Sequence, residues 1–481
     1  MRDTADTTLG KNAVVYENRH DGEDAFYLLD NGLDAFVARA ELIQLSESTL
    51  DLQYYLYHDD LVGRLLTSLL WKAADRGVHI RLLLDDMDLG GRDEKMAVLD
   101  SHPNIEVRIF NPFSRRFFRT PQFVTGLGRL TRRMHNKSFI ADNAVAVVGG
   151  RNIGNEYFDA DPALEFADLD VMVLGDTAHR VSSAFDLYWN HQLAKPVAAV
   201  VHKRPDAKRI AKIASEIMSY TKEQETSEYM RALANADLAR QIRNNSVKYL
   251  PGKAAVVYDH PDKIIRPRDA HGLQLMSQLG SVLDKVQHDA VVISPYFVPG
   301  KEGVRFFSRL AARGVRVRIL TNSLASNDVG MVHAGYVKYR KALLENGVEI
   351  YELNKIRERK KRKIGRSSSA SLHAKTFILD DKQIFIGSLN LDPRSVFENT
   401  EIGLVINSPE IASAIASSFE EKILTNAYRV TLEAGENGRK HLVWRGVDNG
   451  KPVTFRVDPH TSIWERLGIN ILRLLPIESQ L

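Results

Sequence analysis

The order of apolar and polar positions along the chain occurs twice. Residues 49–57 (TLDLQYYLY) and 79–86 (HIRLLLDD) are apolar runs of strand length, and a helical pattern that ends at a glycine separates them. The same order returns at residues 290–297 (AVVISPYF) and 316–323 (RVRILTNS). Nearly continuous apolar strands are typical of buried parallel sheets, and a helix between two of them predicts a βαβ unit. We therefore expect an α/β fold that is present in two copies.

Each copy continues with a segment that contains a histidine and a lysine. The two segments are MHNKSFIADNAVAVVGGRNIG (134–154) and LHAKTFILDDKQIFIGSLNLD (372–392). His373 follows His135 by 238 positions, and the glycine and asparagine near the end of each segment keep the same separation. A constant separation over so long a stretch indicates two homologous domains.

The repeat predicts the domain organisation. We expect two tandem α/β domains, each a mixed, mostly parallel sheet flanked by helices, with one active site shared between them. The first domain covers residues 1–200 and the second covers residues 256–430. A polar, helical connector (201–255) joins them, and a C-terminal extension (431–481) contains an amphipathic helix.

Both segments contain the pattern His-x-Lys-x-x-x-x-Asp. Histidine and lysine two positions apart on a strand project from the same face. The aspartates are weaker candidates, because each stands where a hairpin must turn and aspartate is common in turns. The candidate catalytic residues are His135, Lys137, Asp142, His373, Lys375 and Asp380.

Two histidines, two lysines and two asparagines around one point suit a phosphodiester. The lysines, together with Asn152 and Asn390, would bind the non-bridging oxygens and stabilise the charge of the transition state. One histidine would attack phosphorus, and the other would protonate the leaving alcohol and then deprotonate the incoming one. We expect neither a metal ion nor another cofactor, because the cationic side chains would take the place of the metal.

Carboxylates that follow the two motifs are expected to orient the histidines. Asp168 follows the first motif and Glu401 follows the second, and Asp170 and Glu398 are the alternatives. A carboxylate that accepts a hydrogen bond from one ring nitrogen fixes the tautomer and stabilises the imidazolium. Each half is thus expected to supply one such carboxylate.

Composition and charge limit the class of protein. Hydrophobic residues make up 44% and charged residues 26%, a balance typical of soluble globular domains. A net charge of +4 is too small to indicate nucleic acid, and we expect no nucleic-acid partner. The absence of cysteine excludes disulfides and a cysteine nucleophile. No apolar run reaches the roughly 18 residues of a membrane span and no signal-peptide pattern is present, so we expect peripheral membrane association or an anchor outside this segment.

Three segments are candidates for contact with an anionic membrane surface. Basic loops precede the two motifs, at residues 114–119 (SRRFFR) and 355–366 (KIRERKKRKIGR), and their side chains would attract anionic lipid. The amphipathic segment 462–477 contains Trp464 and has the pattern of an interfacial helix. For the two loops the alternative is a solvated loop, and for the third segment it is packing against the body of the protein.

The paired motifs resemble those of the phospholipase D superfamily, and the resemblance runs from about residue 30 to the end. Within the superfamily the chain is most similar to bacterial cardiolipin synthases of the cardiolipin synthase C type, in segments such as VVGGRNIGNEYF and LDPRSVFENTE. The resemblance implies two phospholipase D-like domains and phospholipid substrates. It also implies that Arg151 and Ser388 belong to the substrate-binding residues, and it favours His135 as the nucleophile.

The resemblance implies a function as well. It points to a phosphatidyltransferase of the bacterial inner membrane that makes cardiolipin through a phosphohistidine intermediate. Phosphatidylglycerol or phosphatidylethanolamine would be the donor and phosphatidylglycerol the acceptor. Three alternatives stay open: a phospholipase D that hydrolyses phospholipids to phosphatidic acid, a nuclease of the same superfamily whose basic loops bind the nucleic-acid backbone, and a non-enzymatic binding module.

Overall fold

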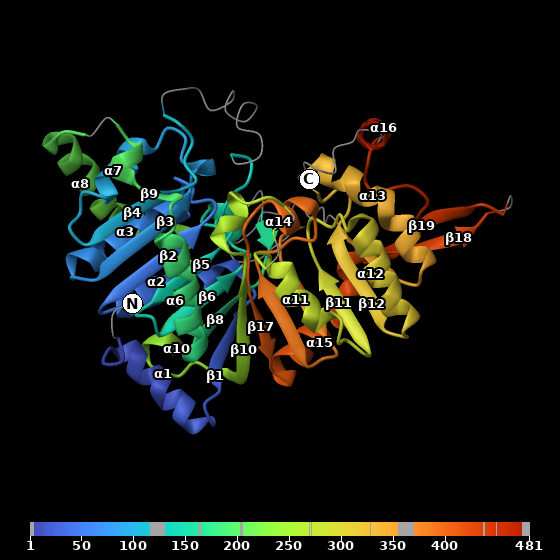
Figure 1. The fold of residues 1–481 in the computed structure, drawn as a ribbon, viewed down its shortest axis with the longest axis horizontal. Helices are drawn as coiled ribbons and strands as arrows, with labels where there is room; N and C mark the ends of the chain where they lie inside the picture. The colour runs from blue at the N-terminus through green and yellow to red at the C-terminus, as the bar shows by residue number, and fades with distance from the viewer. Residues whose placement is uncertain are drawn as a thin grey trace.

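The structure is a computed structural model with two halves that lie side by side (Figure 1). In each half helices cover a mixed β-sheet, so the expected α/β class is confirmed. The described residues are 4–115, 130–161, 165–202, 205–268, 270, 272–327, 329–354, 370–435, 438–448 and 450–473.

The sheet of the first half has the strand order β9-β4-β3-β2-β5-β6-β8-β1. Its strands are β1 (Asp24–Leu29), β2 (Thr49–Tyr54), β3 (His79–Asp85), β4 (Ile105–Phe110), β5 (Ser138–Ala141), β6 (Val145–Gly149), β8 (Asp170–Leu174) and β9 (Ala194–Pro196). Its main helices are α2 (Gly32–Leu45), α3 (Leu61–Asp75), α4 (Asp93–Leu99) and α6 (Asp176–Trp189).

The sheet of the second half has the order β10-β17-β16-β15-β11-β12-β13-β18-β19-β20. Its strands are β10 (Leu250–Tyr258), β11 (Asp289–Ile293), β12 (Arg316–Asn322), β13 (Glu349–Leu353), β15 (Thr376–Leu379), β16 (Gln383–Gly387), β17 (Ile402–Asn407), β18 (Ala427–Ala434), β19 (Lys440–Asp448) and β20 (Lys451–Phe455). Its helices are α11 (Leu275–Leu283), α12 (Gly300–Ala312), α13 (Gly330–Glu345), α14 (Pro393–Phe397) and α15 (Pro409–Asn426).

The balance of strand directions differs from the expectation of mostly parallel sheets. In the two large sheets, parallel pairing among the described strands is confined to β2-β3-β4 and β11-β12-β13. The strands that carry the motifs are antiparallel to their neighbours, because tight hairpins join β5 to β6 and β15 to β16. Asp142 and Asp380 begin these turns with φ values of 48° and 53°, a backbone conformation that aspartate tolerates better than most residues.

The two halves share one apolar core. β1 pairs with β10, and the short strands β7 (Glu165–Ala167) and β14 (Ala370–Leu372) pair across the junction. Buried aliphatic side chains from both halves meet in one cluster, among them Ile140, Val148, Val171, Ile386 and Leu404. Burial of each such side chain contributes roughly 1.5–3 kcal/mol, so this core holds the two motif strands in a fixed relation.

The connector consists of three helices that pack on the first half. These are α8 (Ala207–Glu223), α9 (Glu228–Ala234) and α10 (Asp237–Arg243), and they contact α2 and α3. The last residues of the predicted connector, from Leu250, are not part of these helices, because they form the first part of strand β10. At the other end of the chain, α16 (Ile463–Leu472) contacts α13. In the described ranges, no helix is both long enough and apolar enough to span a bilayer.

Candidate active site

The first motif is attached to the second half by backbone hydrogen bonds. The His135 N–H donates to the carbonyl of Thr400 at 2.8 Å, and the Thr400 N–H donates to the carbonyl of Arg133 at 3.0 Å. Lys137 directly precedes β5, which runs antiparallel to β2 and therefore begins beside the carboxyl end of β2. The carboxyl ends of parallel strands are the usual place for ligands in α/β sheets.

The second motif mirrors this arrangement. The N–H groups of His373 and Ala374 donate to the carbonyl of Ala167 at 2.9 and 3.0 Å. Lys375 directly precedes β15, whose first residue pairs with the last residue of β11. Each motif is therefore held at the junction by backbone atoms of the opposite half.

The histidine–carboxylate pairs are crossed between the halves. His135 Nδ1 lies 2.8 Å from Glu401 Oε2, and His373 Nδ1 lies 2.6 Å from Asp168 Oδ2. Asp168 and Glu401 thus lie at the histidines as expected, and each binds the histidine of the opposite half. The reason is that Thr400 and Ala167, which bind the histidine backbones of the opposite half, directly precede the two carboxylates. In both pairs Nδ1 faces the carboxylate, so Nε2 is the nitrogen left for chemistry.

Both lysines are buried next to their histidines. Lys137 Nζ donates to the carbonyl of His135 at 2.6 Å and lies 5.5 Å from the centre of the Tyr55 ring. Lys375 Nζ lies 3.0 Å from His373 Nδ1 and also donates to the His373 carbonyl. Burial lowers the pKa of Lys137 well below its usual value, and the charge of Lys375 lowers it further. The two cations are therefore close enough to act on one anion.

The two histidines are in different electrostatic surroundings. Burial lowers the pKa of both histidines, and the charges of Lys137 and Lys375 add to the effect on His135. Burial also raises the pKa of Glu401 to about 7. For Asp168 burial would raise the pKa, but the charges of His373 and Lys375 outweigh it and the net shift is downward. The His373 partner is thus an ionised carboxylate, whereas the His135 partner titrates near neutral pH.

The two asparagines also differ. Asn152 Oδ1 accepts from the Leu56 N–H at 3.2 Å, and its Nδ2 donates to the Tyr157 hydroxyl at 3.0 Å. Asn390 Oδ1 is buried and has no hydrogen-bond partner within the described part of the chain. Both polar atoms of the Asn152 amide are therefore held by the protein, whereas the Asn390 oxygen is not.

Arg151 and Ser388 support the site rather than face a substrate. The Arg151 guanidinium donates to the carbonyls of Tyr157, Leu29 and Asp168 at 2.7–3.0 Å, and only 1% of the residue is exposed. The Ser388 hydroxyl donates to Glu401 Oε2 at 2.5 Å. The implied substrate-binding role of both residues is corrected, because their polar atoms are committed to the protein.

The motif aspartates lie at the opposite ends of the strands from the histidines. The Asp142 carboxylate accepts from the backbone N–H groups of Glu47, Ser48 and Thr49 at 2.8–3.0 Å. Asp380 likewise accepts from the N–H groups of residues 287–289, just before β11. Their place among the catalytic candidates is therefore corrected: each fixes the entry of the chain into a central parallel strand.

Asp142→Ala is expected to lower the free energy of unfolding by roughly 2–4 kcal/mol, because three backbone donors lose a charged acceptor. The turnover per folded molecule should be unchanged. Urea unfolding and activity measured on the same sample check both expectations. Asp21→Ala is the control, since Asp21 is an exposed turn aspartate with a similar φ of 51°. A loss of kcat without a loss of stability would contradict the structural role.

The two alternative candidates for orienting the histidines bind arginines instead. Asp170 Oδ2 accepts from Arg39 at 2.7 Å, and Glu398 Oε2 accepts from Arg132 at 2.5 Å. Neither is placed as a partner of a catalytic histidine, which leaves Asp168 and Glu401 in that position.

Three further side chains complete the site. The rings of Tyr55 and Tyr157 meet the edges of His135 and His373 at centroid distances of 5.0 and 5.2 Å. Arg394, on α14, is one of the charges that lower the pKa of His135. Tyr157 and Arg394 were not expected, although both lie a few positions after a motif asparagine.

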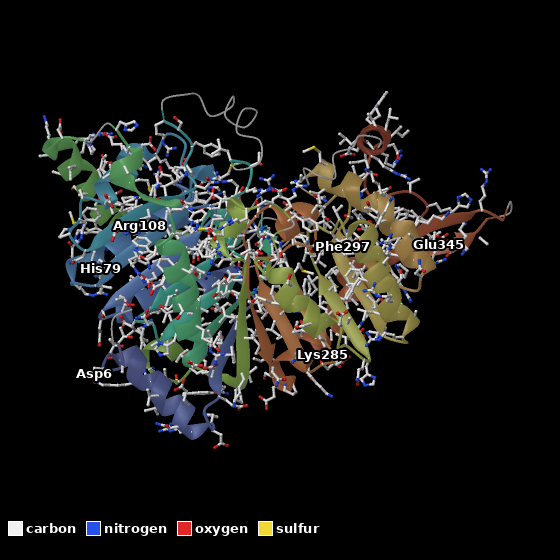
Figure 2. The ribbon with its side chains drawn as sticks, viewed as in Figure 1. Asp6, His79, Arg108, Lys285, Phe297 and Glu345 are labelled. Atoms are coloured by element: carbon white, nitrogen blue, oxygen red, sulfur yellow. The ribbon has the colours of Figure 1, made fainter. Side chains whose placement is uncertain are left out.

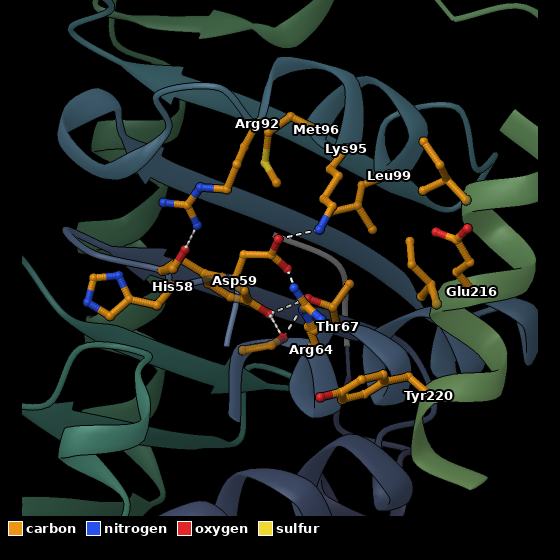
Figure 3. A pocket seen from close by; sticks show the side chains of 14 residues that line it. His58, Asp59, Arg64, Thr67, Arg92, Lys95, Met96, Leu99, Glu216 and Tyr220 are labelled. Carbon is orange, nitrogen blue, oxygen red and sulfur yellow. Dashed lines mark hydrogen bonds and ion pairs between the residues drawn. The ribbon is translucent and has the colours of Figure 1, made fainter. Parts of the chain in front are cut away.

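A charged hollow of about 290 Å³ lies beside the site in the first half, between the loop after β2, α4 and α8 (Figure 3). The side chains of Lys95 and Arg64 both point at Asp59 and form ion pairs with it. Because its charges pair with one another, the hollow presents little net charge to a ligand.

The same region supports the wall of the active site. His58 Nδ1 lies 2.9 Å from Asp88, and its Nε2 lies 3.1 Å from Glu156. These hydrogen bonds raise the pKa of His58 to about 10, so it bridges the two carboxylates as a cation. Glu156 directly precedes Tyr157, and the bridge therefore holds the segment whose ring contacts His373.

The arrangement suits in-line substitution at a phosphodiester. Two imidazoles, each with one nitrogen bound to a carboxylate, flank two buried ammonium groups, and 9% of His135 and 7% of His373 are exposed. The ammonium groups and the Asn390 amide can bind the non-bridging oxygens, while the histidines face the bonds that form and break.

Comparisons with known proteins agree with this chemistry. The family model described as "Cardiolipin synthase, PLD-like domain" matches residues 40–189 and 279–423. The chain is 41% identical to cardiolipin synthase C of Escherichia coli (strain K12), over 96% of this chain and 97% of that protein. It is 32% identical to an uncharacterized protein of Helicobacter pylori (strain ATCC 700392 / 26695), over 98% and 92% of the two chains.

A solved structure shares the fold. The phosphatidylserine synthase of Haemophilus influenzae Rd KW20 superimposes with a TM-score of 0.57 at 14% identity, covering 87% of this chain and 92% of that one. The family model, the full-length similarity and the paired motifs lead to one conclusion. This chain belongs to the cardiolipin synthase, PLD-like domain family of the phospholipase D superfamily.

Proposed function

We propose that this protein is a phosphatidyltransferase that makes cardiolipin from two phospholipids. The observation that carries the proposal is the pair of buried histidines, each bound through Nδ1 to a carboxylate of the opposite half. Two such histidines allow a two-step transfer through a covalent enzyme intermediate. The similarity to cardiolipin synthase C over nearly the whole chain supports the choice of substrates.

In the first step Nε2 of one histidine attacks phosphorus of the donor lipid. The phosphorus–oxygen bond to the headgroup alcohol breaks, and the second histidine gives its proton to the leaving oxygen. In the second step the same histidine takes the proton from a hydroxyl of phosphatidylglycerol, whose oxygen attacks phosphorus and displaces the first histidine. We assign the attack to His135 and the proton transfers to His373. Asp168 then stabilises the imidazolium form of His373.

The remaining site residues bind the phosphate oxygens and orient His135. Lys137, Lys375 and the Asn390 amide bind the non-bridging oxygens, whose negative charge grows in the transition state. Glu401 accepts a hydrogen bond from the Nδ1–H of His135, and this tautomer leaves the lone pair of Nε2 free to attack phosphorus.

We also propose that the protein works at an anionic membrane surface, at the inner membrane of a bacterium. Helix α16 supports this, because 79% of Trp464 and 72% of Ile463 are exposed while Ile469 is buried. An aromatic side chain on an exposed apolar face is typical of interfacial helices. The second basic loop and residues 116–119 of the first lie outside the described residues, and Arg115 is bound to Asp86 and Asp93.

Lipid analysis tests the function. The purified protein is incubated with vesicles of labelled phosphatidylglycerol, with and without phosphatidylethanolamine, and the products are identified by mass spectrometry. We expect labelled cardiolipin, and we expect its formation to survive a metal chelator. Phosphatidic acid as the sole product would show a hydrolase instead, and cleavage of a plasmid with unchanged lipid would show a nuclease.

A further inference from the structure

Each half has a groove between the two helices that flank its first parallel strand, and the two grooves differ in what covers them. In the first half the connector helices α8, α9 and α10 pack over the groove between α2 and α3 and leave a pocket of about 290 Å³. Tyr229 of α9 is 1% exposed, its ring lies 5.9 Å from the Phe36 ring, and its hydroxyl donates to the Phe158 carbonyl at 3.0 Å. The protein thus covers part of the apolar surface of this groove with its own chain.

In the second half the groove between α11 and α12 is open and forms a cavity of about 510 Å³. A shift of 240 positions relates Phe36, Ala40 and Gln44 of α2 to Met276, Gly280 and Asp284 of α11. For the second wall the shift is 237 positions, as for Gly77 and Gly314 at the helix ends, so Leu65 and Leu69 of α3 correspond to Glu302 and Phe306 of α12. No described segment covers this second groove as the connector covers the first. A mostly apolar cavity of this size is in the range of small-molecule and lipid-chain sites.

The wall of the cavity is continuous with the second catalytic motif. Phe377 is 1% exposed, lines the cavity and lies two positions after Lys375 along the same strand. Leu391 directly follows Asn390 and pairs with Phe297, which Figure 2 labels on the loop after β11. The cavity therefore begins immediately behind the residues that would bind the phosphate.

Helix α14 separates the cavity from the first histidine. Arg394 of this helix is close enough to His135 to lower its pKa, whereas Val396 and Phe397 line the cavity. Phe397 is 46% exposed, so an apolar surface also continues from the cavity to the outside.

The charges at the rim indicate the occupant. The exposed Arg305 and Arg309 of α12 line the open groove, and Lys301 adds a third cation. Glu302, 3.9 Å from Arg305, and Asp284 are the acidic residues of the rim. An apolar helix like those of the connector would have to bury both arginines. An anionic amphiphile would place its chain in the apolar interior and its charge at the cations.

We propose that this cavity binds an acyl chain of a phospholipid at the second half of the active site. The inference rests on the proposed function, because it names where a lipid substrate places one of its chains. It also assigns different tasks to the two halves: only the half with the open groove binds a chain, and the other half uses the same groove to hold the connector.

Gly280→Leu tests the proposal with little risk to folding. A Cβ at Gly280 would meet nothing within 4 Å, and leucine favours a helix over glycine by roughly 0.8 kcal/mol. The added side chain should fill the cavity. Ser281→Leu is the matched control, because it adds the same side chain at the next, exposed position of α11, outside the cavity.

The readout is photolabelling by phosphatidylglycerol that carries a diazirine in its acyl chain, in vesicles, followed by peptide mapping. We expect label on α12 and on peptides that contain Phe377 or Phe397, and a loss of at least roughly ten-fold in Gly280→Leu but not in Ser281→Leu. Label that is absent from the cavity, or unchanged in Gly280→Leu, would overturn the proposal. A change of oligomeric state in Gly280→Leu with unchanged label would show that a second copy of the chain occupies the groove.

Labelling does not require turnover, so the two proposals can fail separately. The same experiment in the His373→Ala variant should give the same label without any product. Label in the cavity of a wild-type protein that forms no cardiolipin would contradict the proposed reaction and retain the acyl-chain site.

Discussion

His135→Ala and His373→Ala are each expected to lower kcat by roughly 10⁴–10⁶-fold, because each removes a group that no neighbour can replace. The two motifs form one site, in which His373 and both lysines lower the pKa of His135. Residual activity near the wild-type level in either variant would contradict a shared site. His288→Ala, at an exposed histidine of the second half, is the control.

The two variants should differ in a second measurement. With a nitrophenyl ester of phosphatidic acid, the leaving group needs no proton, so loss of the proton donor should spare the first step. We expect His373→Ala to release nitrophenol in a burst and to trap a phosphohistidine at position 135, and His135→Ala to show neither. The reverse result would exchange the two roles and leave the shared site intact.

Mixing the two inactive variants should not restore activity. The halves share a core that includes Ile140, Val148, Ile386 and Leu404, so each site is completed within one chain. Activity that appears slowly on mixing would show that chains exchange halves, which this core should prevent.

The repeat and the identity of the site residues could be predicted because they are local patterns. The spacing of the motifs shows which residues share a strand face, and Asp168 and Glu401 stand in equivalent places after them. The crossing of the pairs could not be predicted this way. It depends on backbone contacts across the junction, and the paired residues are 205 and 266 positions apart.

Buried arginine and aspartate were misjudged for a related reason. Arg151 was a candidate for substrate binding and Asp142 a weaker candidate for catalysis, but backbone groups of the protein satisfy both. A sequence shows which polar groups are available, and only the fold shows which are already bound. The open groove is a similar case, since its exposure depends on where the connector helices pack.

Glu401→Gln is expected to lower kcat/KM by roughly 10²–10⁴-fold and to change the shape of its pH profile. Burial raises the pKa of Glu401 to about 7 and lowers that of His135, so below pH 7 the Glu401 carboxyl is mostly protonated. As the pH rises through about 7 the carboxyl loses its proton, and the carboxylate can accept a hydrogen bond from the Nδ1–H of His135. The wild-type rate should therefore rise across this range, and the glutamine variant should lack the rise.

Asp168→Asn should behave differently although it is the equivalent residue. Its pKa is shifted downward, so the carboxylate is ionised at every pH where the enzyme is assayed. We expect kcat/KM to fall by a similar factor at every pH, so that the rise near pH 7 remains. Glu398→Gln is the control for both, because its carboxylate binds Arg132 and contacts neither catalytic histidine.

Proton NMR of the imidazole N–H groups can separate the crossed pairs from pairs within each half. With the two resonances assigned from the alanine variants, Asp168→Asn should shift the Nδ1 proton of His373 and leave that of His135, and Glu401→Gln should do the opposite. If each substitution shifted the Nδ1 proton resonance of the histidine in its own half, the crossed arrangement would be wrong. The expected result would show that each histidine depends on a carboxylate from the opposite half. The packing of the two halves against each other therefore also forms the catalytic histidine–carboxylate pairs.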